Sequence, residues 1–184
     1  KRTITNTYHY DQANASDDAT ATKANTAYNA STLAFNAPAA SEVVTTVAKN
    51  DKSWTLKGWG ASTVWGGATQ TATIGIGGEH SVNTTASAYS FYPVYALTTT
   101  KFYANYNYLK DGQTAYTTVQ KNVTVNGDAA DGAMPIPTGS DNGSGADVAK
   151  FYTKGAYIYE LKGWSETEYD LGEGTATIPY GGAT

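Results

Sequence analysis

The residues of this chain best suited to acid–base catalysis at neutral pH are its two histidines, His9 and His80. A catalytic histidine needs a nucleophile or an orienting carboxylate within hydrogen-bond reach. Ser and Asp are common here, but neither histidine lies in an H-E-x-x-H metal motif, and the sequence has no G-x-S-x-G nucleophile elbow. We therefore interpret both histidines as surface or half-buried side chains, and we predict that the chain is not an enzyme.

Carboxylates gather in the segment GSDNGSGAD, Gly139–Asp147, with Asp128 and Asp131 upstream. Calcium takes about six to eight oxygen ligands from closely spaced Asp, Asn and backbone carbonyls, so this composition is typical of a calcium loop. The spacing of Asp141 and Asp147 does not match an EF-hand loop, and no Glu closes the segment. We expect a solvated surface loop that needs no cofactor, and a calcium site stays open as the alternative.

Two further patterns have ordinary interpretations. Glu166, Glu168, Asp170 and Glu173 form an acidic cluster, but paired glycosidase carboxylates need a cleft that holds them a few ångströms apart. A small module seldom builds such a cleft, so a solvated loop is expected. The glycine-rich segment Gly75–Gly78 lacks the Lys-Ser/Thr of a phosphate loop, and we expect it to form a hairpin turn.

Composition favours strands and excludes several classes of protein. The chain has 184 residues, with 15 Tyr and 19 Gly, and 40% of it is hydrophobic. Tyr, Thr and Val suit a pleated surface, and Gly and Asn suit turns. A net charge of −4 without basic runs argues against nucleic-acid binding. The absence of Cys excludes disulfides and thiolate metal sites, and no apolar run is long enough to cross a bilayer.

Low charge, many Thr and Tyr, and no Cys fit an exported surface protein better than a cytosolic enzyme. The chain begins with Lys1 and Arg2, which fits either a cut end or a mature form released from a precursor. Sequons for N-glycosylation begin at Asn14, Asn29, Asn83, Asn122 and Asn142. They are near the number expected by chance, and they matter only in a host that glycosylates exported proteins.

The sequence is internally duplicated. Three segments recur in the same order, and the matched pairs are ITNTYHY (4–10) with FYANYNY (102–108), WTLKGW (54–59) with YELKGW (159–164), and TATI (71–74) with TATI (175–178). Alternation of apolar residues predicts that 4–10 and 102–108 are strands with one apolar face. We therefore predict two tandem modules, residues 1–98 and 99–184.

The first module has a further expected strand at Tyr89–Leu97, in which Pro93 predicts a bulge or an edge position. The second module has no counterpart, which leaves its opening strand, 102–108, with an edge free to pair. We expect either that the polypeptide continues beyond Thr184 or that another chain supplies the strand by β-augmentation.

Helix is expected at Ser41–Asn50, where Ser41 suits an N-cap and the valines recur at helical spacing, and more briefly at Asp147–Gly155. A single helix packed on a sheet is what a β-grasp fold requires. The predicted fold is therefore mainly β, an α+β β-grasp-like module in two copies. Two immunoglobulin-like β-sandwiches, which would have no helix, are the alternative.

The order of these motifs resembles the Listeria–Bacteroides repeat, the internalin B-repeat-like β-grasp module. Its aromatic strand and closing strand are matched by Trp54–Trp59 with Tyr92–Ala96, and by Tyr157–Trp164 in the second copy. Pro38, Pro135 and Pro137 are candidates for its mid-module proline. The middle segments, 11–53 and 109–156, are longer than in the family, and the glycine before the strand survives only as Gly155. The resemblance implies a bacterial cell-surface location, as a stalk or a ligand-contacting repeat.

The Gly-Trp pairs Gly58-Trp59 and Gly163-Trp164 are the site residues singled out, and their expected role is structural. A glycine at a strand end allows a turn or bulge, and the next Trp then covers one end of a small core. Burial of such a ring contributes about 2–3 kcal/mol. The opposing interpretation is that these rings are exposed and stack on sugars.

The predicted function is a non-catalytic, secreted, extracellular structural or adhesion module of a bacterial surface protein, with a protein or glycan as surface partner. One alternative is a structural subunit of a virion, fibre or filament that self-assembles through an edge strand. Another is a carbohydrate-binding module, for which a planar exposed row of Trp65, Tyr92 and Tyr169 would be the discriminating feature. Fold analogy carries much of this prediction.

Overall fold

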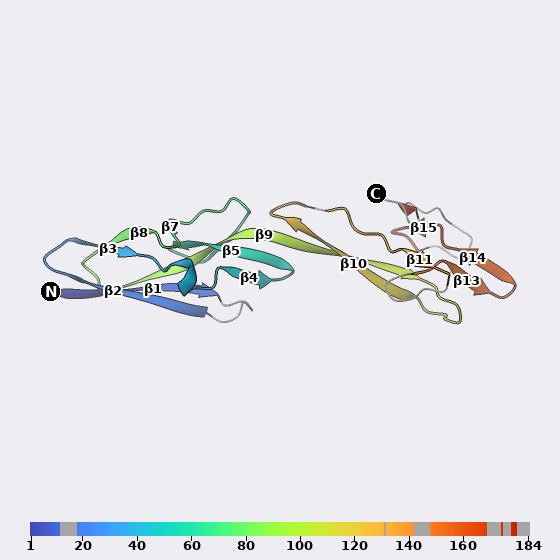
Figure 1. Ribbon diagram of the computed structural model, residues 1–184, viewed down its shortest axis with the longest axis horizontal. Coiled ribbons are helices and arrows are strands. Elements are labelled where there is room, and N and C mark those ends of the chain that lie inside the picture. The colour runs from blue at the N-terminus through green and yellow to red at the C-terminus, as the bar shows by residue number, and fades with distance from the viewer. Residues whose placement is uncertain (12–17, 131, 142–147, 169–173, 175–177, 180–184) are drawn as a thin grey trace. The chain divides into compact units, whose positions relative to one another are not determined.

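The computed structural model describes residues 1–11, 18–130, 132–141, 148–168, 174 and 178–179 (Figure 1). Within them the chain is mainly β, as predicted, and the helical structure is limited to one 3₁₀ turn, Ala40–Glu42. The chain divides into unit 1, residues 1–100 and 125–130, and unit 2, residues 101–124 and 131–184. The module bounds predicted from the duplicated sequence, 1–98 and 99–184, stay a prediction.

Unit 1 is built on a mixed sheet in the order β2-β1-β9-β5-β4. The strands are β1 (Arg2–Asp11), β2 (Asp18–Ala27), β4 (Thr46–Lys49), β5 (Lys52–Gly60) and β9 (Ala88–Tyr108), the last of which continues into unit 2. The neighbours are antiparallel, except that β1 and β9 run parallel, with Thr5–Tyr8 opposite Ala88–Phe91. The first and last long strands of unit 1 are therefore parallel neighbours inside the sheet.

Shorter strands complete unit 1. The strand β6 (Val64–Gly66) runs parallel to β9, and β7 (Ile74–Gly75) pairs with the end of β5. A separate ladder joins β3 (Thr32–Asn36) to β8 (Glu79–Asn83). The turn between β7 and β8 is closed by a 3.0 Å hydrogen bond from Gly78 N to Gly75 O. The predicted turn at Gly75–Gly78 is present, but it does not close a hairpin, because β7 pairs with β5 and β8 pairs with β3.

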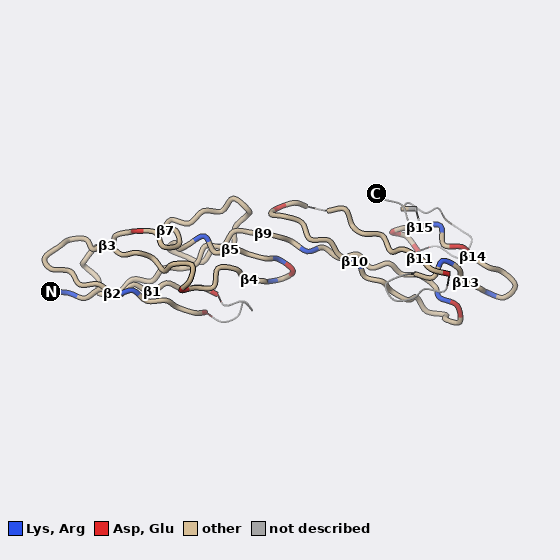
Figure 2. Tube along the Cα trace, in the orientation of Figure 1, with Lys and Arg blue, Asp and Glu red and all other residues tan. Residues whose placement is uncertain are grey.

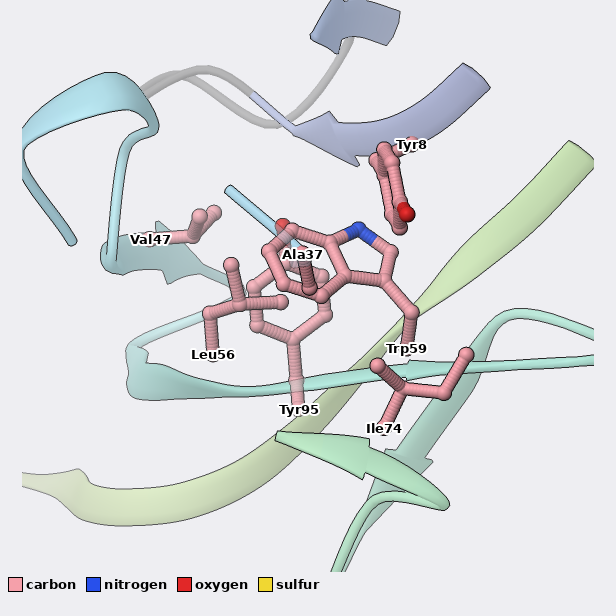
Figure 3. Packing of buried hydrophobic residues seen from close by; sticks show 7 residues of the cluster. All are labelled: Tyr8, Ala37, Val47, Leu56, Trp59, Ile74 and Tyr95. Carbon is pink, nitrogen blue, oxygen red and sulfur yellow. The ribbon is translucent and has the colours of Figure 1, made fainter. Parts of the chain in front are cut away.

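The core of unit 1 lies between the sheet and the segments that cross it (Figure 3). Its main cluster consists of Tyr8, Ala37, Val47, Leu56, Trp59, Ile74 and Tyr95. A second cluster of Ile4, Phe35 and Val82 lies beneath the β3–β8 ladder. Alternate residues of β1 point inward because successive side chains of a strand face opposite sides.

The helix predicted at Ser41–Asn50 is wrong. Only the 3₁₀ turn forms there, and Thr46–Lys49 is the strand β4, in which Val47 pairs with Trp54. The valines and threonines of this segment have higher strand than helix propensity, and the hairpin with β5 buries Val47 completely. The helix predicted at Asp147–Gly155 is also wrong, since its described residues form the strands β12 (Val148–Ala149) and β13 (Phe151–Lys154).

The described residues therefore contain the parallel pairing of first and last strands that a β-grasp sheet has, but no helix packed on it. A mainly β fold is what the structure supports.

Unit 2 holds smaller pieces of sheet. The strand β10 (Thr117–Asn126) pairs with β9. The short strand β11 (Gly139–Ser140) runs parallel to β12, and β13 forms a hairpin with β14 (Tyr157–Glu160). The last pair is β15 (Gly163–Trp164) with β16 (Ile178–Pro179), which are antiparallel. The buried cluster of unit 2 consists of Tyr106, Tyr108, Val148, Ala149 and Trp164. This core is smaller than that of unit 1, and three of its five residues are aromatic.

Candidate functional site

The two units repeat one local framework, which the strand registers make explicit. In the hairpin β4–β5, residues 46–49 pair with 55–52; in β13–β14, residues 151–154 pair with 160–157. Each hairpin has a two-residue loop, at 50–51 and at 155–156. The next hydrogen bond is also the same in both, from Leu56 N to Thr45 O and from Leu161 N to Lys150 O, each at 2.8 Å.

A Tyr–Trp–Ile arrangement follows each hairpin. Trp59 pairs with Ile74 and Trp164 pairs with Ile178, which are the isoleucines of the two TATI segments. Each tryptophan also meets a tyrosine edge-to-face. The ring centroids of Tyr8 and Trp59 are 5.3 Å apart at 72°, and those of Tyr106 and Trp164 are 4.9 Å apart at 70°. The residues that match in sequence thus occupy matching places in the two units.

The structure places the Gly58-Trp59 pair at the centre of unit 1. Gly58 has φ of +138°, and a Cβ there would lie 1.9 Å from the carbonyl oxygen of Ile74, so no other residue fits without rearrangement. Pairing with β9 shifts register between Leu56 and Gly58, and Trp59 lies opposite Pro93. Trp59 is fully buried, and its Nε1 donates a 2.8 Å hydrogen bond to the carbonyl oxygen of His9.

In unit 2, Gly163 is half-buried in β15 and Trp164 is 8% exposed. Both tryptophans of the Gly-Trp pairs are therefore core residues. An exposed, sugar-stacking role for Trp59 and Trp164 is inconsistent with this burial.

His80 belongs to a polar cluster with Asn6 and Tyr8. Its Nε2 lies 3.0 Å from Tyr8 Oη and 3.3 Å from Asn6 Nδ2, and Asn6 is fully buried. Burial lowers the pKa of His80, and the nearby backbone of Gly78 opposes this shift to a smaller extent. The imidazole is thus neutral at pH 7. Its hydrogen bonds fix β8 against the inner face of β1.

His9 has different partners. Its Nδ1 lies 2.9 Å from Asp18 Oδ2, and its ring stacks on Tyr92 with centroids 4.9 Å apart and planes at 11°. Asp18 is exposed, so this pair is a surface contact. The two histidines therefore have separate structural roles, as half-buried residues in strands.

An open depression that sequence reasoning missed lies beside the β4–β5 hairpin. It is lined by Lys49, Asn50, Lys52, Trp54 and Trp65 and has a volume of about 220 Å³. Lys49 Nζ lies 4.7 Å from the centroid of Trp65, and Lys52 Nζ lies 6.0 Å from that of Trp54. These distances are in the range of cation–π contacts.

The depression offers little free aromatic surface to a sugar ring. Tyr95 stacks on Trp65 with centroids 4.4 Å apart at 15°, which covers one face, and Lys49 lies over the same ring system. Tyr92 stacks on His9, and Tyr169 lies outside the described residues. For Trp65 and Tyr92, the planar exposed row that would indicate carbohydrate binding is not found.

Several predicted sites fall partly outside the described residues. Of the calcium candidate, Asp131 and the segment 142–147 lie outside them. Asp128 is described, and its Oδ2 accepts a 2.8 Å hydrogen bond from Ala68 N. In the acidic cluster, Glu166 and Glu168 are exposed, while Asp170 and Glu173 lie outside. Within the described part of the chain, no group of three His, Asp or Glu residues is placed to hold a metal ion.

Comparison of the chain with protein-family models, with curated proteins and with solved structures finds no match. Among the described residues, no helix is long and apolar enough to span a membrane. Charged residues are scattered over both units, without a basic stripe along the described trace (Figure 2). The architecture and its contacts therefore carry the functional argument.

Proposed function

We propose that this chain is a non-catalytic structural or adhesive repeat of an extracellular surface protein. The observation that carries the proposal is the repeated framework: the same hairpin register followed by the same Tyr–Trp–Ile contact in both units. The polar side chains that could do chemistry are instead used to hold strands together, as His80 does. Repetition of a folding unit suits a protein that spaces, displays or attaches.

The test is the location of the protein on its own cells. An antibody raised against the folded chain should label intact cells, and protease added outside should remove the label. Labelling that requires permeabilised cells would contradict the proposal. A cytoplasmic protein detected in the same samples is the control for cell lysis.

One observation favours the second candidate, a filament subunit that assembles by strand exchange. In unit 1 the opening strand β1 is flanked on both sides, by β2 and by β9. The matching segment in unit 2, 102–108, lies in β9 and pairs there with β10, and no other described strand pairs with it. An edge of this kind is a template for a strand from a neighbour.

Light scattering coupled to size-exclusion chromatography, across a concentration series, separates the two candidates. Concentration-dependent chains or rings would favour strand exchange. A monomer at every concentration would favour the module of a surface protein.

A further inference from the structure

We propose that the parallel pairing of β1 with β9 is a mechanical clamp through which unit 1 bears tension along the chain. This inference rests on the proposed structural role, because only a tethered protein experiences such a load. The reasoning begins with the sheet order. In the described pairings the hairpin β1–β2 joins the rest of the sheet through β1 alone, and the partner of β1 is β9.

The direction of loading follows from the parallel register. The chain enters unit 1 at the start of β1 and passes toward unit 2 along β9, which runs on from Ala88 to Tyr108. Because the two strands are parallel, pulling these two points apart slides one strand along the other. The hydrogen bonds between Thr5–Tyr8 and Ala88–Phe91 are then loaded together rather than broken one after another.

Further hydrogen bonds extend this seam beyond the four paired residues. Before it, Arg2 Nη1 donates to Thr84 O at 2.7 Å, and Thr5 N donates to Ser87 O at 3.0 Å. After it, Asp11 N donates to Tyr95 Oη at 2.8 Å. Tyr95 is fully buried and Asp11 is half-buried, so that last bond is partly shielded from water. The two strands are tied at both ends of the pairing.

Aromatic side chains lock both faces of the seam. Tyr8 stacks on Phe91 with centroids 5.2 Å apart at 22°, and His9 stacks on Tyr92 at 4.9 Å and 11°. Because neighbouring residues of a strand face opposite sides, these two stacks lie on opposite faces of the sheet. Sliding β1 along β9 must separate both stacks as well as the hydrogen bonds.

This 184-residue chain has no Cys, so introduced cysteines can serve as unique handles for single-molecule pulling on the whole chain. The pair Lys1→Cys and Lys101→Cys loads the β1–β9 seam in shear. The pair Lys1→Cys and Ser87→Cys pulls at the same end of both strands, so the seam is peeled open from Thr5. Forced unfolding reports the barrier along the pulled direction. We expect the shear pair to unfold unit 1 at a force at least about twofold higher than the peeling pair.

Two Tyr→Phe variants on β9 provide a matched comparison. Tyr95→Phe removes the acceptor for Asp11 N. Tyr89 lies within the pairing, but its hydroxyl donates to Asn83 O at 2.9 Å and not to β1, so Tyr89→Phe removes no bond between the two strands. Tyr95→Phe should lower the shear force and leave the peeling force unchanged, because peeling begins at the opposite end. Tyr89→Phe should change neither.

Equal forces in the two directions would overturn the clamp, as would a Tyr95→Phe variant that weakens both directions alike, since that indicates a general loss of stability. These measurements use purified protein and do not depend on where it is located. Failure of the cell-surface labelling would therefore reject the proposed function without affecting the mechanical result, and the reverse also holds.

Discussion

Removal of the indole of Trp59 should strongly destabilise unit 1 while leaving the stability of unit 2 unchanged. Trp59 is fully buried, packs edge-to-face on Tyr8 and donates a hydrogen bond to His9 O. Truncation of a buried Trp to Ala costs about 3–5 kcal/mol, and this total already includes the cavity left behind. Against a typical domain stability of roughly 5–15 kcal/mol, Trp59→Ala removes a large part of what holds unit 1 together.

Hydrogen exchange measured by mass spectrometry gives the readout for each unit separately. A loss of about 4 kcal/mol raises the opened fraction roughly a thousandfold, since each 1.4 kcal/mol is a factor of ten. In Trp59→Ala, the amides of β1 and β5 should exchange faster by about that factor, while those of β13 and β14 keep their protection. Trp164→Ala should give the reverse pattern, because Trp164 packs on Tyr106 in the other unit.

Trp59→Phe is the matched control. It keeps an aromatic ring near Tyr8 and loses the bond to His9 O, for which we expect about 1–2 kcal/mol and roughly tenfold faster exchange in unit 1. If Trp59→Ala accelerated exchange equally in both units, or not at all, the assignment of each Trp to its own core would be refuted.

Three further predictions concern single residues. Gly58→Ala should destabilise unit 1 by on the order of 3 kcal/mol in urea denaturation, because the added Cβ would meet the carbonyl oxygen of Ile74. Gly75→Ala is the control and should cost much less, because a Cβ at Gly75 faces open space. Similar losses of stability in the two variants would contradict this explanation. Burial lowers the pKa of His80, so the unfolded state binds protons more readily than the folded state. The urea midpoint should therefore be constant above about pH 6.5 and should fall as the pH decreases below about 6.5. His80→Gln should remove this dependence of the midpoint on pH. Burial raises the pKa of Tyr95 to about 12, so stability should decrease as pH rises from about 10 toward 12, and a Tyr95→Phe chain with the same alkaline profile would show that another group is responsible.

Strand positions were predictable where local pattern and burial agree. In β1 the alternation of Ile4 and Tyr8 marks the inward face, and both side chains are fully buried. The repeated LKGW segments likewise mark the ends of the hairpins β4–β5 and β13–β14, because Leu56 and Leu161 make the same backbone hydrogen bond. These features depend on contacts between residues close in sequence or on the alternation of apolar side chains along a strand. Both can be recognised in a single sequence.

The helix predicted at Ser41–Asn50 does not form because residue type outweighs the spacing of apolar residues in this segment. The valines fit a helical period, but β-branched residues lose side-chain freedom in a helix. A better signal was present in Asn50-Asp51, both of which adopt positive φ of 53° and 58° in the two-residue loop. Asn and Asp tolerate that conformation, so the dipeptide between two apolar stretches indicates a hairpin.

The depression beside the β4–β5 hairpin, lined by Trp54, Trp65 and two lysines, had no comparable signal in the sequence. It depends on β6 lying parallel to β9, which brings Trp65 against Tyr95 from a distant part of the chain. Pairings of this kind are set by the packing of the whole unit. Residue type alone marks Trp65 as a candidate for sugar stacking, but the Tyr95 ring that covers one of its faces is not predictable from the sequence.

Divergence between the two units shows which part of the framework folding requires. The sequence match that aligns Tyr8 with Tyr106 places Asn6 opposite Ala104, so the buried Asn6–His80 cluster of unit 1 has an apolar residue at the corresponding point of unit 2. The edge-to-face Tyr–Trp contact is present in both units. A buried amide with hydrogen-bonding partners adds specificity to a core, whereas apolar and aromatic burial supplies most of its stability. The aromatic contact is therefore the common folding element, and the polar cluster is an addition that fixes β8 against β1 in unit 1.

Asn6→Ala introduces the residue that unit 2 has at the matching position, so it should cost less stability than Tyr8→Ala. A larger loss of stability for Asn6→Ala than for Tyr8→Ala would make the polar cluster the dominant element.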